Sequence, residues 1–165
     1  MYSQKRKIIK KPANIVDNMK CIGNNIIGQD NTIIEITNNL WYLTKFNHKK
    51  LYDIMLYGNS SLGKTELVPE IAKYFFDNNF FLKSISQCSK IIIMPIIFLG
   101  NIQIKKNLGY DLLERESNLI FLDEIDKCPE YFYSAFYSLF DNSIFKDGNY
   151  DADVSGTIIV MTLIF

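Results

Sequence analysis

Eight consecutive residues, 58–65, read GNSSLGKT and fit the pattern GxxxxGK[ST]. The two glycines let the backbone turn so that successive N–H groups point at one anion. Lys64 can reach the β and γ phosphates of a nucleotide, and the Thr65 hydroxyl can ligate Mg²⁺. An ordinary strand-to-helix turn is the alternative, but a chance match occurs in roughly 0.5% of chains of this length. The segment therefore predicts a phosphate-binding loop.

The predicted cofactor-binding residues are those of this loop and the residue that follows it. They are Gly58, Asn59, Ser60, Ser61, Leu62, Gly63, Lys64, Thr65 and Glu66. A helix that begins near Lys64 would add the positive end of its dipole at the same place. The predicted ligand is therefore a polyphosphate.

Two acidic residues, Asp123 and Glu124, follow the apolar run 119–122. A strand buried on both faces that ends in Asp brings this carboxylate to the carboxyl edge of a parallel sheet, beside the phosphate loop. There Asp123 can hold Mg²⁺ through water, opposite Thr65, and Glu124 can act as the base for the attacking water. An acidic strand end alone is common, but after a phosphate loop it predicts nucleotide hydrolysis.

These residues need a sheet and helices to position them. Apolar spacing predicts helices over residues 30–43, 64–77 and 129–140. Apolar runs predict strands over residues 51–57, 80–85, 119–122 and 157–165. Residues 91–99 are ambiguous between strand and helix, and residues 147–149 predict a turn, with a hairpin tip as one interpretation. Strands alternating with helices predict an α/β fold, a three-layer sandwich with a mostly parallel sheet.

Length and composition predict one such domain. The chain has 165 residues, of which the basic residues 1–16 are expected to form a flexible tail and residues 17–165 the domain. A nucleic-acid or membrane arm is the alternative for the tail. Lys plus Arg (18) equals Asp plus Glu (18), so no overall charge attracts nucleic acid or a membrane. The longest apolar run, about ten residues, is too short to span a bilayer.

Three widely spaced cysteines, Cys21, Cys88 and Cys128, form no CxxC pair, and His48 is the one histidine. This usage argues against a zinc site or a disulfide framework and favours a reducing compartment, hence a cytoplasmic location. Cys128 is expected to be a structural thiol. Six aromatic residues crowd the predicted helix 129–140, and without interleaved Lys or Arg they favour packing over base stacking. They are Tyr131, Phe132, Tyr133, Phe136, Tyr137 and Phe140.

The phosphate loop, the segment LIFLDEIDK (119–127) and the segment IIGQD (26–30) together resemble the AAA+ superfamily. Within it, the chain is most similar to the C-terminal ATPase module of Clp-type protein unfoldases, over residues 22–162. The resemblance implies ATP and Mg²⁺ as cofactors, with Ile26 and Ile27 against the adenine ring. It also implies Asp123 as organiser of Mg²⁺, Glu124 as activator of water, a protein substrate, and a hexameric ring or AAA+ partner subunits.

The chain also departs from the family pattern. The family strand that resembles residues 157–162 ends with a polar residue, usually Asn, that positions water. Here Leu163, Ile164 and Phe165 follow, so this polar residue is expected to be absent. The family's arginine finger, worth about 10³ to 10⁵ in turnover in related enzymes, and its helical lid come later. The chain is therefore expected to be truncated before both and to hydrolyse ATP slowly or not at all.

Three functions remain open from the sequence. The first is Mg·ATP binding with hydrolysis that drives protein unfolding or remodelling in an intact relative. The second is a nucleotide-binding module without turnover. The third, a nucleic-acid motor of the same superfamily, is disfavoured by the zero net charge. Residues 100–110 lack the family's aromatic pore-loop motif, which leaves grip on a protein substrate open.

Overall fold

The computed structural model describes residues 15–46, 51–59, 63–75, 81–85, 112, 118–128, 130–146 and 151–164. Most of the predicted tail, the ambiguous segment 91–99, the region 100–110 and the proposed hairpin tip lie outside these residues. So do three residues of the phosphate loop, Ser60, Ser61 and Leu62.

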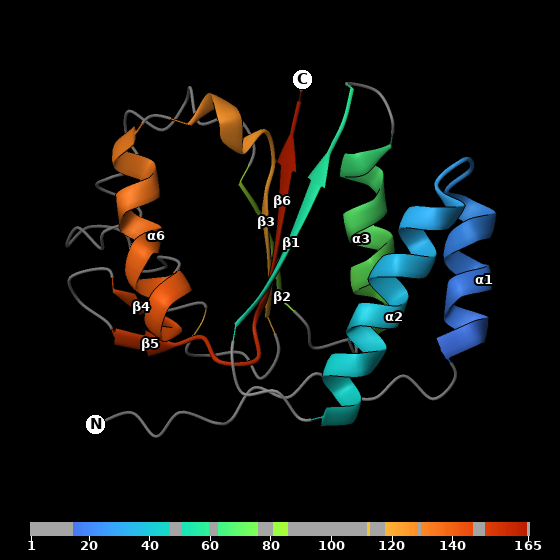
Figure 1. The fold of residues 1–165 in the computed structure, drawn as a ribbon, viewed down its shortest axis with the longest axis horizontal. Coiled ribbons are helices and arrows are strands. Elements are labelled where there is room, and N and C mark those ends of the chain that lie inside the picture. Colours follow the sequence, from blue (N-terminus) through green and yellow to red (C-terminus); the bar gives the residue numbers. More distant parts are fainter. Residues whose placement is uncertain are drawn as a thin grey trace.

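Four strands form one parallel sheet in the order β1-β6-β3-β2 (Figure 1). Their bounds are β1 Tyr52–Tyr57, β2 Phe81–Ile85, β3 Asn118–Leu122 and β6 Ile158–Leu163. Strand β6 therefore lies between β1 and β3, although it comes last in the chain. The predicted parallel sheet is confirmed, and each predicted strand lies within two residues of its observed bounds.

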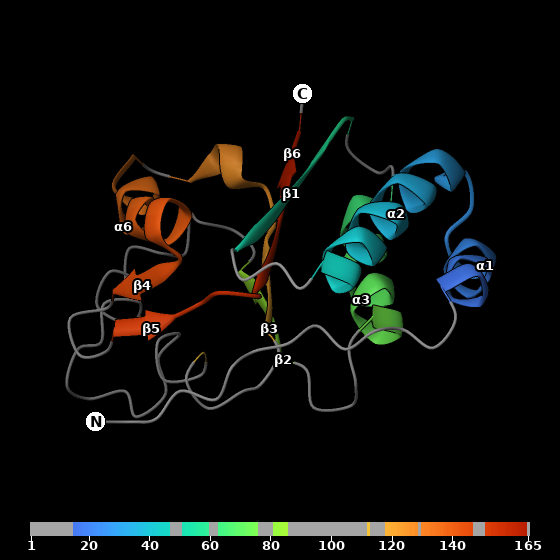
Figure 2. The same ribbon diagram turned by 60° about the horizontal axis from the view of Figure 1, so that its bottom comes forward.

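Helices cover both faces of this sheet, as the α/β prediction requires. Figures 1 and 2 show α1, α2 and α3 together on one side of the sheet and α6 with a small hairpin on the other. The first group is α1 Ile15–Asn25, α2 Asp30–Phe46 and α3 Lys64–Phe75. The second is α6 Glu130–Asn142 with the antiparallel strands β4 Ile144–Lys146 and β5 Asp151–Asp153. A short 3₁₀ helix, η2 Ile125–Lys127, leads from β3 toward α6.

Two apolar clusters hold the three layers together, and β3 and β6 contribute to both. In β3, Leu119 and Phe121 pack against α1, α2 and α3, whereas Ile120 and Leu122 pack toward α6. Successive side chains of a strand point to opposite faces, so a strand covered on both sides is apolar throughout. This explains why β3 and β6 read as nearly continuous apolar runs rather than as alternating ones.

Helix α1 differs from the sequence prediction, which places no helix before residue 30 and includes residues 15 and 16 in the flexible tail. The segment is helical because Ile22 and Ile26, one turn apart, are buried against α2 and α3. A short segment rich in Asn forms a helix only weakly by itself, so this tertiary packing decides its structure.

The aromatic residues of α6 divide between core and surface. Phe136 is 2% exposed and packs between the sheet and the hairpin, with its ring centroid 6.3 Å from that of Phe145. Tyr137 is 66% exposed and Phe140 is 39% exposed. The packing interpretation is therefore confirmed for Phe136 and wrong for Tyr137, because one helix face alone meets the sheet.

The cysteines differ from expectation at one position. Cys21 is a free, exposed thiol, but Cys128 is disulfide-bonded and not the structural thiol expected. Sequence spacing alone does not show which cysteines the fold brings together. Among the described residues, no helix combines the length and apolar character needed to cross a membrane.

Replacing Phe136 by Ala removes a buried ring from the core and is expected to lower the free energy of unfolding by about 3–5 kcal/mol. Tyr137→Ala is the matched control on the next position of the helix and should change it by less than about 0.5 kcal/mol. Urea denaturation followed by circular dichroism measures both. Equal losses for the two variants would contradict the observed orientation of α6.

Candidate functional site

Three strands end at the same edge of the sheet and bring the predicted chemical groups together. Strand β1 runs directly into Gly58, β3 runs into Asp123, and β6 carries Thr162 near its end. In the register of the sheet, Leu56 lies opposite Thr162, and Leu122 lies opposite Met161. Figure 1 shows the carboxyl ends of β1 and β6 side by side, with α3 beginning next to them. Ligands of open parallel sheets bind at this edge.

The described parts of the phosphate loop have the backbone that its glycines predict. Gly58 has φ 145° and Gly63 has φ 73°, both in the range that residues with a Cβ rarely adopt. The carbonyl of Gly63 accepts the N–H of Leu67 at 3.0 Å, which begins α3. The first turn of α3 carries Thr65 and Glu66, both exposed. The unpaired N–H groups of this turn make its end a site for anions.

Lys64 folds back over the loop. Its Nζ donates hydrogen bonds to the carbonyl oxygens of Gly58 and Asn59, each at 2.6 Å. These bonds hold the positive charge beside the N-terminus of α3, where the helix dipole has the same sign. Both features favour a negatively charged group at this point.

Asp123 receives two hydroxyl groups from two other elements. Thr162 Oγ1 of β6 donates to Asp123 Oδ1 at 2.6 Å, and Thr65 Oγ1 of α3 lies 3.4 Å from the same oxygen. The predicted magnesium pair, Thr65 and Asp123, is therefore together in the folded chain. Carboxylate and hydroxyl oxygens beside a phosphate site are the hard ligands that Mg²⁺ takes, usually with several waters. The donor set fits Mg²⁺.

Glu124 has the left-handed backbone conformation, with φ 54° and ψ 52°. A residue with a side chain adopts it at a cost of about 1–3 kcal/mol and needs local support. Three contacts supply that support. The N–H of Glu124 donates to Thr162 Oγ1 at 2.8 Å, and its carbonyl accepts the N–H of Lys127 at 3.0 Å. Lys127 Nζ also lies 2.7 Å from Glu124 Oε2.

The turn after Glu124 is tied to α6. Tyr133 donates its hydroxyl hydrogen to the carbonyl oxygen of Ile125 at 2.6 Å, and Ile125 itself is buried. The hydrogen bond to Glu124 is the largest cause that raises the pKa of Lys127, with further support from the charges of Glu124, Asp126 and Asp123. The two acidic residues therefore sit on a turn that is fixed from both sides.

The two residues assigned to adenine differ in their exposure. Ile26 is buried in the cluster between the sheet and α1, α2 and α3, whereas the side chain of Ile27 is 92% exposed. Ile27 is thus accessible to a ligand, and Ile26 serves the core. Their role toward a base stays a prediction.

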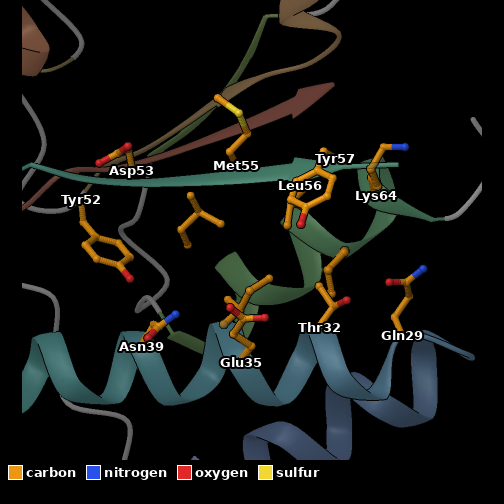
Figure 3. A pocket seen from close by; sticks show the side chains of 13 residues that line it. Gln29, Thr32, Glu35, Asn39, Tyr52, Asp53, Met55, Leu56, Tyr57 and Lys64 are labelled. Carbon is orange, nitrogen blue, oxygen red and sulfur yellow. The ribbon is translucent and has the colours of Figure 1, made fainter. Parts of the chain in front are cut away.

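A pocket of about 460 Å³ runs along β1 between this strand and α2 (Figure 3). Lys64, Tyr57 and Gln29 gather at one end, whereas Tyr52 and Asn39 lie at the other. The carboxylates of Glu35 and Asp53 also line the pocket. Burial of Tyr52 is the main cause that raises its pKa, and the negative charges of Asp53 and Glu35 raise this pKa further. This negative lining disfavours phosphate along the pocket and leaves the loop end as the anion site.

Sequence reasoning missed one residue of the site. The sequence prediction concerned only the family's polar residue at the end of the strand, where Leu163 and Ile164 stand here, and it did not consider Thr162. In the structure, Thr162 places its hydroxyl between Asp123 and Glu124. The available signal was a single polar residue in the run IIVMTL of β6. A buried hydroxyl in a strand of this kind needs hydrogen-bond partners.

Comparison with known proteins gives a fold-level match. No family model matches the chain. Two solved structures of Hsp104 superpose on it with a TM-score of 0.70 and 18% sequence identity. One is a closed state with ATPγS and casein and covers 91% of this chain. The other is an extended casein complex from S. cerevisiae and covers 94%. The chain spans 28% of the length of each of those Hsp104 chains.

The comparison therefore shows that this chain shares its fold with a part of Hsp104.

Proposed function

We propose that this chain is a Mg·ATP-binding module of the AAA+ type whose site is built for ATP hydrolysis. The observation that carries the proposal is the meeting of Lys64, Thr65, Asp123 and Glu124 at one edge of the sheet. Lys64 and Thr65 begin α3, whereas the two acids follow β3, so only the fold unites them. The superposed Hsp104 structure with ATPγS supports the choice of nucleotide.

Each of these residues has a distinct role in the proposal. Lys64 and the N–H groups at the start of α3 hold the phosphates. Thr65 and Asp123 hold Mg²⁺, which neutralises developing phosphate charge when bound. Glu124 accepts a proton from the attacking water at its carboxylate. Lys127 binds Glu124 Oε2 at 2.7 Å, so the proton goes to the other carboxylate oxygen, Oε1, or to Oε2 after this pair opens.

We further propose that hydrolysis drives remodelling of a protein substrate and that AAA+ subunits assemble into a ring. The support is the fold shared with Hsp104, whose structures include casein. A fold alone does not specify a function, so the substrate proposal is less direct than the nucleotide proposal. A cytoplasmic location, which the cysteine usage predicts, is not part of this proposal, because Cys128 is disulfide-bonded and disulfides persist mainly in oxidising compartments.

The second candidate is nucleotide binding without turnover. One observation favours it: the carboxylate of Glu124 is engaged in an ion pair with Lys127. The pair occupies Oε2, one of the two carboxylate oxygens that could take a proton from water. The two candidates differ in turnover and share the same binding site.

Lys64→Ala is expected to weaken binding of a fluorescent ATP analogue by about 10- to 100-fold, because charged hydrogen bonds to phosphate contribute about 1.5–3 kcal/mol. Fluorescence anisotropy with Mg²⁺ measures the dissociation constant. Lys73→Ala, an equal charge change on the exposed side of the same helix, is the control and should bind as the wild type does. Equal affinity of the Lys64 variant and the wild type would refute the proposed site.

Glu124→Gln separates the two candidates. If the chain hydrolyses ATP, this variant should keep nucleotide affinity and lose turnover by at least about 10²-fold, since a positioned base contributes that much or more. Phosphate release measures turnover on the same samples. Slow turnover that is identical in wild type and variant would favour the module without hydrolysis.

The same substitution tests the ion pair. Loss of the carboxylate charge should lower the pKa of Lys127 toward its ordinary value, because the hydrogen bond to Glu124 is the main cause that raises it. In the wild type the pair should persist at neutral pH and break only as the pH rises through the raised pKa of Lys127. NMR titration of the lysine side chains measures this. An unchanged Lys127 titration in Glu124→Gln would mean that the pair does not form in solution.

A further inference from the structure

The carbonyl oxygen of Ile125 joins the turn after the acidic pair to helix α6. It accepts the N–H of Cys128 at 3.0 Å, which closes the 3₁₀ turn η2, and it accepts the hydroxyl hydrogen of Tyr133 at 2.6 Å. A carbonyl oxygen has two lone pairs, so these two donors use its full capacity. The first bond is local to the turn, whereas the second comes from a separate helix.

The ring of Tyr133 is held by the core. It is partly buried and packs against the apolar cluster between α6, the hairpin and one face of the sheet. On the same helix Phe136 is buried in that cluster, which fixes the face that α6 turns to the sheet. A partly buried Tyr has an apolar ring for the core and a hydroxyl that needs a partner. Tyr133 therefore connects the core to the turn.

Glu124 stands directly before η2, and the turn determines where its carboxylate lies. Its backbone is left-handed, with φ 54° and ψ 52°, and its carbonyl accepts the N–H of Lys127 at 3.0 Å. Lys127 Nζ also lies 2.7 Å from Glu124 Oε2. A left-handed residue with a side chain is strained and keeps its conformation only where its neighbours hold it. A looser turn would therefore release the Glu124 carboxylate.

We infer that Tyr133 is a positioning residue, which directs the Glu124 carboxylate by holding the Ile125 carbonyl from α6. The inference rests on the proposed function, because it takes Glu124 as the group that acts on water. Tyr133 acts through the backbone of the turn, so it is not a catalytic residue. The sequence analysis assigned Tyr133 to packing, which its ring does, and the positioning task belongs to its hydroxyl.

Two substitutions isolate this hydroxyl. Tyr133→Phe removes it and keeps the ring that packs against the core. Tyr137→Phe is the matched control, because it makes the same change one turn further along α6, where the residue is 66% exposed. All samples are kept free of reductant, so that the disulfide at Cys128 stays intact in each of them.

The first readout needs no nucleotide and reports on the Glu124 carboxylate. Tyr133→Phe should lower the pKa of Lys127 toward its ordinary value, because the hydrogen bond to Glu124 is the largest cause that raises it. NMR titration of the lysine side chains measures this. Hydrogen exchange of the Lys127 and Cys128 amides, whose bonds close the turn, should become about two- to tenfold faster. Tyr137→Phe should match the wild type in both measurements.

The second readout is ATP turnover, with nucleotide affinity measured on the same samples. Tyr133→Phe should lower kcat by about two- to tenfold, the range that one net hydrogen bond contributes. It should leave the dissociation constant of a fluorescent ATP analogue within about twofold of the wild-type value, because Glu124 acts on water and Lys64 holds the phosphates. A residue that only stabilised the fold would not separate turnover from affinity in this way.

The outcomes distinguish the inference from the proposed function. Wild-type titration of Lys127 and wild-type amide exchange in Tyr133→Phe would overturn the inference and leave the nucleotide site standing. A loss of affinity as large as the loss of turnover would overturn it too. Absence of Lys64-dependent binding in the wild type would refute the proposed function, and the Lys127 titration would still show whether Tyr133 positions Glu124.

Discussion

The parallel pairing of β6 with both β1 and β3 is the constraint on which the rest of the structure depends. These two ladders place a strand from the end of the chain between two earlier ones. Because all three strands run in the same direction, their carboxyl ends lie at one edge. The phosphate loop, the acidic pair and the hydroxyl of Thr162 all lie at these ends. No local feature of the sequence brings them together.

The burial of β6 explains why one polar residue in it matters. Its residues from Ile158 to Met161 are buried, and they pack alternately on the two helical layers. A hydroxyl in such a strand costs free energy unless it is hydrogen-bonded, and Thr162 sits where the strand reaches two acids. The same contact helps offset the strain of the Glu124 backbone, which Lys127 supports from the other side. Thr162 is therefore both a buried residue of the sheet and a hydrogen-bond partner of the two acidic residues.

The likeness to Hsp104 combines a close overall fold with 18% identity. Such a combination is reasonable because a sheet covered on both faces requires apolar residues at particular positions but not particular residue types. Chemical function depends instead on the loop, the acids and their partners, which are few and specific. The proposed nucleotide chemistry therefore rests on the residues of the site. The likeness to Hsp104 supports only the fold that positions these residues.

The sequence by itself determined the parallel α/β fold and placed the glycine-rich loop and the acidic pair at strand ends within it. It could do so because glycines at Gly58 and Gly63, continuous apolar runs and helical spacing act locally or repeat with a clear period. Tertiary structure alone decided the remainder. Helix α1 forms because Ile22 is buried against other helices, Tyr137 is exposed because α6 presents another face to the sheet, and Cys128 joins a disulfide. Thr162 became a site residue for the same reason, since its partners lie 38 and 39 residues away and only sheet register brings them within hydrogen-bond distance.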